Sequence, residues 1–546
     1  MQKAPLSLEQ ARHFRGLVQQ RDKDSIQLLA QLLASLNSPL PVDVPTCIEL
    51  HDTFLFLLAY PANARERQLA ESGLSVLKKH IRQIMLTGTR RDQLLLSGSG
   101  LPGTLLSCQF SLPITRWLTE KFPAAVSYDS AAGDARAGAA VLHQLFPRIE
   151  YACTTQGNRT LDVRLRSLTG KRDPLIPLLE AFKQRVGDES LQEILFDNLQ
   201  LFTSWELNDP VFNRTDLRGI HLPVHYHKKM IRKPGAARSA TEKIPDEIML
   251  TPAQKQHLLD AARASLAFYT RETEPITLAE VRNTRLFNCG RGLAIALFGI
   301  KKERRLSLES YIGYMAFKNN IPVAYGGGWI FGERCKIGLN IYPPFRKGES
   351  ALLFARLLTL YSQVYGVRRF VVTPYQFGKG NTEGLESAAF WFYYKLRFRP
   401  QDESIAKLAE EEFQSGRKSD IALLKRFTAS NMERCLDPRL PNDIDPEAIS
   451  RRITEMIIRR FEGDRREAIR SGIKRTARVL KIGHPEFFQP WLNQFALLLE
   501  LVGDMETWPA PEHRNLRSLL AARKKTEMAY IYQLQQCHYL LRALSS

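Results

Sequence analysis

The chain has 546 residues, 44% of them hydrophobic and 25% charged, which are ordinary values for a globular protein. One hydrophobic core stops growing at roughly 250–300 residues, so this length excludes a single-core protein and predicts several domains. The 77 Lys and Arg outnumber the 57 Asp and Glu, and the net charge of +20 is spread along the whole chain. Such a charge favours anionic partners, namely CoA, nucleotides, nucleic acid or a membrane surface, although it also fits a basic surface that only maintains solubility.

The compartment is predicted from the cysteines and from the apolar runs. Seven cysteines lie far apart without a C-x-x-C pair, which fits a reducing environment and neither a zinc ribbon nor a disulfide framework. No apolar region of a secretory signal follows Met1. The longest apolar runs, Phe54–Tyr60 and Leu293–Ile300, are far shorter than the ~20 residues that span a bilayer. We therefore predict a cytoplasmic location and no transmembrane segment.

Residues 1–227 are expected to form a mainly α-helical N-terminal domain. Leucines and isoleucines recur at helical spacing within residues 26–36 and again within residues 74–84. Further along, helices such as Leu175–Val186 are expected to alternate with short strands such as Leu161–Leu165. This part resembles no family from which a function follows.

A basic linker is expected next, over residues 228–246, because Lys, Arg, Pro, Gly and Ala dominate there. Three histidines precede it, and the spacing of His221, His225 and His227 resembles that of metal ligands. No cysteine or carboxylate lies close in sequence to complete a ligand shell, and Lys228 and Lys229 would repel a cation. We therefore predict no metal site.

Residues 247–400 are expected to form a mixed α/β domain. A helix over Pro252–Thr270 comes first, and the hairpin Ser310–Phe317/Ile321–Trp329 turns across Lys318, Asn319 and Asn320. The other expected elements are strands Leu293–Ile300, Cys335–Tyr342 and Arg369–Thr373, helix Glu349–Tyr365, a Gly-rich loop Tyr375–Gly384 and an aromatic helix Glu386–Leu396. This order predicts an α+β fold with a central mixed sheet, flanked by mainly helical regions.

After Pro400 a helical, basic C-terminal region is expected over residues 401–546. Its segment Arg451–Lys481 carries 11 Arg and Lys against 4 Asp and Glu, with isoleucines spaced to bury one side. This pattern fits contact with phosphates of nucleic acid or tRNA, or with a membrane surface. The alternative is a solvated helix face without a partner.

The turn Arg346–Ser350 is the first candidate binding site. It joins a strand to a helix N-terminus, where free N–H groups and a partial positive charge attract anions. Gly348 lets a phosphate approach the backbone, and Arg346 and Lys347 add full charges. The alternative is an ordinary turn that needs Gly348 for its conformation and uses Ser350 as an N-cap.

These elements and motifs resemble the GNAT acyltransferase superfamily over about 110 of the 546 residues. The family's pyrophosphate loop reads Gln/Arg-x-x-Gly-x-Gly/Ala, and here Gly348 and Ser350 match its two small residues while Phe345 stands at the first position. The closing helix of the family commonly ends in Tyr-x-Lys-x-Gly-Phe. Tyr393, Lys395 and Phe398 match that ending, whereas Arg397 replaces the glycine and Glu386 stands where asparagine is frequent.

The resemblance implies binding of acyl-CoA, with acetyl-CoA as the expected form, and direct transfer of the acyl group to an amine. Arg346, Lys347, Gly348 and Ser350 would then hold the cofactor, and Tyr393 would protonate the leaving thiolate. An N–H group of a strand would hold the oxyanion. Glu383, with Glu333 as the other option, is the candidate base, and the loop residues Gln376, Lys379 and Asn381 are candidate contacts of the acceptor.

Two classes of function stay open. One is an acyl-CoA-dependent N-acyltransferase, with an aminoacyl-tRNA-dependent, Fem-like transferase as a variant. The other is an inactive GNAT-like module that binds nucleic acid or a protein. Glu349 separates them, because a carboxylate that caps the amides of Gly348–Ser350 would block a diphosphate there.

Overall fold

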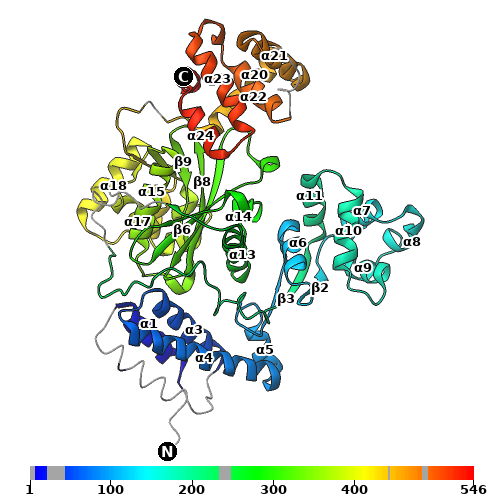
Figure 1. The fold of residues 1–546 in the computed structure, drawn as a ribbon, viewed down its shortest axis with the longest axis vertical. Helices are drawn as coiled ribbons and strands as arrows, with labels where there is room; N and C mark the ends of the chain where they lie inside the picture. Colours follow the sequence, from blue (N-terminus) through cyan, green and yellow to red (C-terminus); the bar gives the residue numbers. More distant parts are fainter. Residues whose placement is uncertain are drawn as a thin grey trace, which may run out of the picture.

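The computed structural model describes residues 6–20, 27, 43–232, 247–440, 443–482 and 490–545. It is a mixed α and β structure built around one large sheet, with the N-terminal and C-terminal helices at opposite ends of the molecule (Figure 1). Among the described residues, no helix combines the length and the apolar character needed to cross a membrane. Apart from residue 27, the expected segment at residues 26–36 lies outside the described residues, as does most of the expected linker at residues 228–246.

The N-terminal region contains two parts. The first part packs on the central sheet and consists of helices α1 (Leu8–Gln20), α3 (Val44–Ala59), α4 (Ala64–Thr87) and α5 (Arg90–Leu96). The second part projects sideways (Figure 1) and consists of β1 (Leu105–Cys108), α6 (Leu112–Lys121), β2 (Val126–Ala131), α7 (Ala135–Leu145), α8 (Tyr151–Thr154), α9 (Leu161–Thr169), α10 (Leu175–Arg185), α11 (Glu189–Leu199) and β3 (Leu201–Glu206). Its three strands form an antiparallel sheet in the order β1-β3-β2.

The strand predicted at Leu161–Leu165 is wrong, because these residues begin helix α9. The side chain of Thr160 accepts a hydrogen bond from the Val163 amide and caps this helix. Leu161 and Leu165 are buried one turn apart on a single helical face, so the two leucines fit a helix as well as a strand. The helix predicted at Leu175–Val186 is confirmed as α10.

The central sheet has ten strands among the described residues, in the order β12-β13-β11-β9-β8-β7-β6-β5-β4, with β10 paired to β8 outside this path. All pairs are antiparallel except β9 with β11. The strands are β4 (Glu247–Ile248), β5 (Arg285–Asn288), β6 (Leu293–Gly299), β7 (Ser310–Lys318), β8 (Ile321–Phe331), β9 (Arg334–Ile337), β10 (Asn340–Ile341), β11 (Arg369–Val372), β12 (Arg399–Pro400) and β13 (Met432–Cys435). The predicted central mixed sheet is confirmed.

Helices cover this sheet and share its hydrophobic core. They are α13 (Pro252–Phe268), α14 (Glu274–Thr277), α15 (Ser350–Tyr365), α16 (Thr382–Glu386), α17 (Ala389–Lys395), α18 (Glu403–Ser415) and α19 (Ile421–Phe427). The aromatic helix is shorter than the predicted Glu386–Leu396, because Ala388 adopts a left-handed conformation (φ 50°) that separates α16 from α17. The expectation that only helices follow Pro400 is also wrong, since β13 supplies a strand of the sheet.

The turn between β7 and β8 attaches the N-terminal region to the sheet. Asn319 and Asn320 both have positive φ (47° and 72°), as the tight hairpin turn requires. The Asn319 side chain donates hydrogen bonds to the carbonyl oxygens of Ala59 (2.9 Å) and His225 (3.0 Å), and Asn320 donates to Leu222 (3.0 Å). The segment that ends the N-terminal region is thereby fixed beside helix α15.

The C-terminal region is a helical bundle at the far end of the molecule (Figure 1). Its helices are α20 (Pro446–Phe461), α21 (Arg465–Leu480), α22 (Pro490–Leu501), α23 (Ala510–Arg523), α24 (Glu527–Gln535) and α25 (His538–Ser545). Most of its buried residues form a separate hydrophobic cluster, to which Phe331 of β8 also belongs. The predicted helical character of residues 446–545 is confirmed for the described part.

Candidate active site

The two parallel strands of the sheet separate at one end. Strand β9 pairs with β11 from Arg334 to Lys336, and the pairing stops before Gly338. Beyond that point β10 continues along β8, while β11 ends at Val372 and the chain turns away. The strand predicted over Cys335–Tyr342 is therefore present as two pieces. An opening at the carboxyl ends of parallel strands is a common place for a ligand in α/β proteins.

The side chain of Gln376 fills this opening. Its Oε1 accepts hydrogen bonds from the Leu339 amide (3.3 Å) and from the Tyr393 hydroxyl (3.4 Å). Its Nε2 lies so close to Gly338 that a Cβ there would be 2.6 Å away, which explains the glycine. One carboxamide oxygen thus joins the amide of Leu339, which lies between β9 and β10, to a hydroxyl of helix α17, as a bound carbonyl group would.

Tyr393 is buried beside the sheet opening. Its side chain is 3% exposed, and burial raises its pKa above the ordinary value for tyrosine, so the hydroxyl keeps its proton. The ring packs edge-on against Phe354 of α15 and against Phe398. Tyr394, the next residue, points elsewhere and donates to Glu410. Of these two tyrosines, Tyr393 is the one that faces the sheet opening, and its role as the acid stays a prediction.

Helix α15 begins beside a cavity of about 370 Å³. The cavity wall combines residues of four segments that are distant in sequence: Gly16, Gln19 and Gln20 of α1; Arg232; Lys347, Gly348, Ser350 and Ala351 at the start of α15; and Phe392 of α17. Two cations and a helix N-terminus therefore face one hollow, an arrangement suited to an anion. Phe392 and Tyr393 are consecutive, so α17 contributes one residue to this cavity and the next to the sheet opening.

Glu349 stands at the helix start, but its carboxylate does not cap the helix. It is 2% exposed and accepts hydrogen bonds from Lys318 Nζ (2.7 Å), Arg291 (2.6 Å) and the Ile231 amide (2.9 Å). His227 Nδ1 lies 3.6 Å away. The negative charge is thus neutralised inside the protein and turned away from the helix amides, so the feature expected to block a diphosphate does not do so.

Burial and charge shift the titration of this cluster. Burial lowers the pKa of Lys318 to about 8 and that of His227 to about 4. Burial alone would raise the pKa of Glu349, but its hydrogen bonds with His227, Arg291 and Lys318 hold that pKa well below its ordinary value. Near neutral pH, Glu349 and Lys318 form an ion pair beside a neutral His227.

The predicted cofactor residues differ in their surroundings. Lys347, Gly348 and Ser350 line the cavity. Gly348 is needed for a reason that the sequence does not reveal, because a Cβ there would lie 2.7 Å from the Tyr60 ring. Arg346 forms an ion pair with Glu383, the candidate base, and both side chains are about half exposed.

The predicted acceptor residues also differ in their positions and contacts. Gln376 lies in the sheet opening, whereas Lys379 is exposed in the loop. Asn381 caps α16 by accepting from the Gly384 amide (3.1 Å), and its amide group donates to the Tyr375 carbonyl. Glu333, the other candidate base, forms an ion pair with Arg368 (3.3 Å) at the far end of β9.

Sequence reasoning missed Leu339, Gln19, Arg232 and Phe392 as parts of the site. Only Arg232 carried a signal, as one of the basic residues expected in the linker. Two of the histidines that precede that linker belong to the cluster around Glu349. The rings of His225 and His227 are in contact (4.7 Å between centroids), and Arg291 lies beside His227.

Comparison with protein-family models, with curated proteins and with solved structures found no match to this chain. The candidate site therefore has to be interpreted from its own geometry.

Proposed function

We propose that this protein is an acyl-CoA-dependent N-acyltransferase with a GNAT-type core. The observation that carries the proposal is the parallel pair β9–β11, which opens at Gly338 and is connected through α17 to a cationic cavity at the start of α15. Antiparallel strands, a strand–turn–helix, a parallel strand and a short aromatic helix follow one another as the resemblance requires.

The diphosphate of CoA would occupy the cavity at α15. The amides of the first helical turn, Lys347 and Arg232 supply positive charge there, and Glu349 is held away by Lys318 and Arg291. Gly16 leaves room on the opposite wall, because no atom lies within 4 Å of the position that its Cβ would take. Arg346, paired with Glu383, lies beside this site as a second source of charge.

The acyl group would enter the opening in place of the Gln376 carboxamide. The thioester oxygen would then accept from the Leu339 amide, which stabilises the oxyanion formed when the amine nitrogen attacks the carbonyl carbon. As the carbon–sulfur bond breaks, Tyr393 gives its proton to the thiolate, and the amine loses a proton to a base. Glu383 stays the predicted base, with its carboxylate at the surface beside Arg346.

The position of Gln376 favours a second candidate function. Because Gln376 satisfies both Leu339 and Tyr393, a module that binds a CoA-like anion without acyl transfer would also have this geometry. The Fem-like variant places the 3′ end of an aminoacyl-tRNA in the opening. The donor of this Fem-like variant, an aminoacyl-tRNA, carries an ester in place of the thioester and would compete with acetyl-CoA.

Calorimetric titration with acetyl-CoA tests the proposal. We expect saturable binding to the wild type, and binding weakened tenfold or more when Lys347→Glu and Arg232→Glu remove two charge-assisted contacts, each of ~1.5–3 kcal/mol. The matched control is Lys379→Glu combined with Arg397→Glu, which changes the net charge equally at exposed positions that do not line the cavity. A large side chain at Gly348, such as Gly348→Trp, cannot be used to block the cavity, because any side chain there collides with Tyr60.

Two results would reject the proposal. Absence of saturable binding to the wild type removes the acyl-CoA site, and equal weakening by both variants shows that only the overall charge matters. Transfer is then tested by thiol release from acetyl-CoA with a set of amines. Binding without release, for every amine and for Gln376→Ala as well, favours the module that does not transfer.

A further inference from the structure

Helix α21 has one face made of small residues, which brings it close to its neighbour. Ala468, Gly472 and Thr476 are buried at intervals of four residues and so lie on one side of the helix. A Cβ at Gly472 would lie 2.5 Å from the Ala496 carbonyl oxygen of α22. This close packing fixes which side of α21 faces the bundle and which side faces outward.

The outward side carries cations. The exposed residues Arg466, Arg470, Lys474 and Arg478 follow one another at intervals of four, and Lys481 continues the row at the helix end. These five residues are called the basic face of α21. Arg466, Lys474 and Lys481 form no ion pair with any residue that the structure describes.

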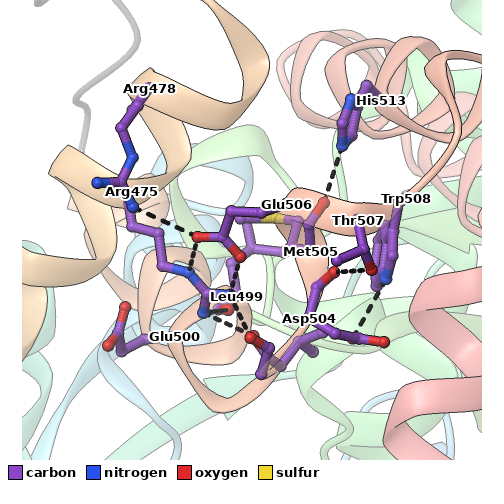
Figure 2. Close-up of polar contacts among 12 residues, drawn as sticks. Arg475, Arg478, Leu499, Glu500, Asp504, Met505, Glu506, Thr507, Trp508 and His513 are labelled. Carbon is purple, nitrogen blue, oxygen red and sulfur yellow. Dashed lines mark hydrogen bonds and ion pairs between the residues drawn. The ribbon is translucent and has the colours of Figure 1, made fainter.

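Arg475 belongs to the same segment but serves the fold. Figure 2 shows its guanidinium group directed toward Glu506 and toward the end of α22, where it donates to the carbonyl oxygens of Val502 (2.6 Å) and Gly503 (2.9 Å). Its hydrogen bonds with Glu506 (2.6 and 2.8 Å) lower the pKa of that carboxyl group to about 2. Arg475 therefore caps α22 and is not available to a partner.

The acidic residues near the basic face do not cancel its charge. Glu506 is engaged by Arg475 and reaches Arg478 only at 3.4 Å (Figure 2). Glu467 pairs with Arg470 at 3.1 Å. Asp464 lies near Arg466 and Arg470 and accepts hydrogen bonds from the amides of Arg466 and Glu467 at the start of α21. With five cations and three carboxylates, of which Glu506 is shared with Arg475, the outward side of α21 keeps a positive charge at neutral pH.

We infer that the basic face of α21 binds the phosphate backbone of a double-stranded nucleic acid. Residues four apart on a helix are about 6 Å apart along its axis. Phosphates of one strand rise ~3.4 Å each along the duplex axis and also wind around it, so successive phosphates lie further apart than this rise, and a row of cations at this spacing can follow the phosphates of one strand. This surface lies at the opposite end of the molecule from α1 and its cavity (Figure 1), so the inference does not depend on the proposed acyltransferase.

A membrane surface fits this helix less well. A helix that lies in a bilayer interface needs a free apolar side beside its cationic side. The inner side of α21 is already packed against α22, and none of the exposed large apolar residues in the described chain belongs to α21. The surface therefore offers charge without an apolar anchor, as contact with a phosphate backbone requires.

The test measures binding of the full chain to short fluorescein-labelled duplexes of DNA and of RNA by fluorescence anisotropy, between about 50 and 200 mM salt. The variant Arg466→Glu/Lys474→Glu changes two cations of the basic face. The matched control, Arg90→Glu/Arg91→Glu, makes the same change in net charge on exposed residues of α5, at the other end of the molecule. Circular dichroism checks that both variants are folded.

We expect the wild type to bind at least one duplex and the basic-face variant to bind it tenfold or more weakly, with the control near the wild type. The slope of log K against log salt should become less steep by about 2, since each lost phosphate contact removes ~0.9. The inference is overturned if the wild type binds neither duplex or if both variants weaken binding equally. It is also overturned if the basic face is required only for binding to vesicles of anionic lipid.

Discussion

Replacing Gln376 with alanine tests whether this side chain closes the proposed acyl site. In the structure its Oε1 accepts from Leu339 at 3.3 Å and from Tyr393 at 3.4 Å. A hydrogen bond contributes about 0.5–1.5 kcal/mol net, and bonds this long belong to the lower half of that range. The two bonds therefore stabilise the closed opening by about 1–2 kcal/mol, which a ligand must overcome.

Gln376→Ala removes this competition, so acetyl-CoA should bind about 5- to 30-fold more tightly, because 1.4 kcal/mol corresponds to a factor of ten. The gain should be smaller for CoA, which lacks the thioester carbonyl oxygen that would take the place of Oε1. Calorimetric titration of both ligands measures the two gains separately. Lys379→Ala, in the same loop but exposed, is the control and should change neither affinity.

A second variant gives the opposite sign. Gln376→Glu keeps the size of the side chain and accepts more strongly from both donors, so acetyl-CoA should bind more weakly than to the wild type. Equal affinities of wild type and Gln376→Ala for acetyl-CoA would refute the idea that Gln376 closes the opening, while leaving the CoA site intact. If no variant binds either ligand, the acyl-CoA proposal itself fails.

Three further changes test the site. Tyr393→Phe should lower kcat by about 10²–10⁴-fold, since it removes the proposed proton donor, and steady-state kinetics would contradict this role if kcat were unchanged. Glu349→Gln should destabilise the chain by ~3–5 kcal/mol in thermal unfolding because it leaves Lys318 buried without a counter-ion, and adding Lys318→Met should recover much of the loss. His227 has its folded pKa lowered from 6.5 to about 4, so the unfolded chain binds more protons between these values and stability should fall as pH falls through that window. The fully buried His227 accounts for about 3 kcal/mol of this fall, which His227→Leu should remove from the pH profile of the unfolding free energy.

The central hairpin was predictable because its local signals agree. Apolar residues on both sides of Lys318, Asn319 and Asn320 continue long enough to indicate strands, and asparagine tolerates the positive φ of the turn. Helix α15 was predictable for a similar reason, with leucines at helical spacing and Gly366 in a left-handed conformation at its end. Both predictions depend on neighbours in sequence.

Strand β13 was missed because its local signal is weak. Met432–Cys435 is only four residues long and places two charged residues between two apolar ones, so no alternation of apolar and polar residues marks a strand, and helices precede and follow it. Arg434 is nonetheless buried and donates to the Leu396 carbonyl at 3.1 Å. Pairing with β11 decides the conformation here, and that pairing joins residues far apart in the chain.

The sequence predicts the turn that precedes helix α15, but it does not predict which residues contact one another in the candidate site. The sequence indicates that a glycine precedes helix α15 and that Tyr393 and Tyr394 face different sides of α17. It does not indicate that Tyr60 needs the space beside Gly348, or that a residue expected to contact the acceptor instead bonds to Leu339. Both facts arise when separate segments meet, and a pattern within one segment carries no information about them.

Contacts between segments that are distant in sequence also determine how the N-terminal region contributes to the candidate site. Tyr60 packs beside Gly348, Asn319 fixes the chain at His225, and His227 approaches Glu349. Helix α1 then adds Gly16 and Gln19 to the cavity wall, and Gln19 donates to the Arg346 carbonyl (3.4 Å). A carboxylate at the start of α15 is compatible with an anion site only because these distant residues turn it inward and neutralise it. The N-terminal helices are therefore part of the construction of the site, and an isolated sheet domain would lack one wall of the cavity.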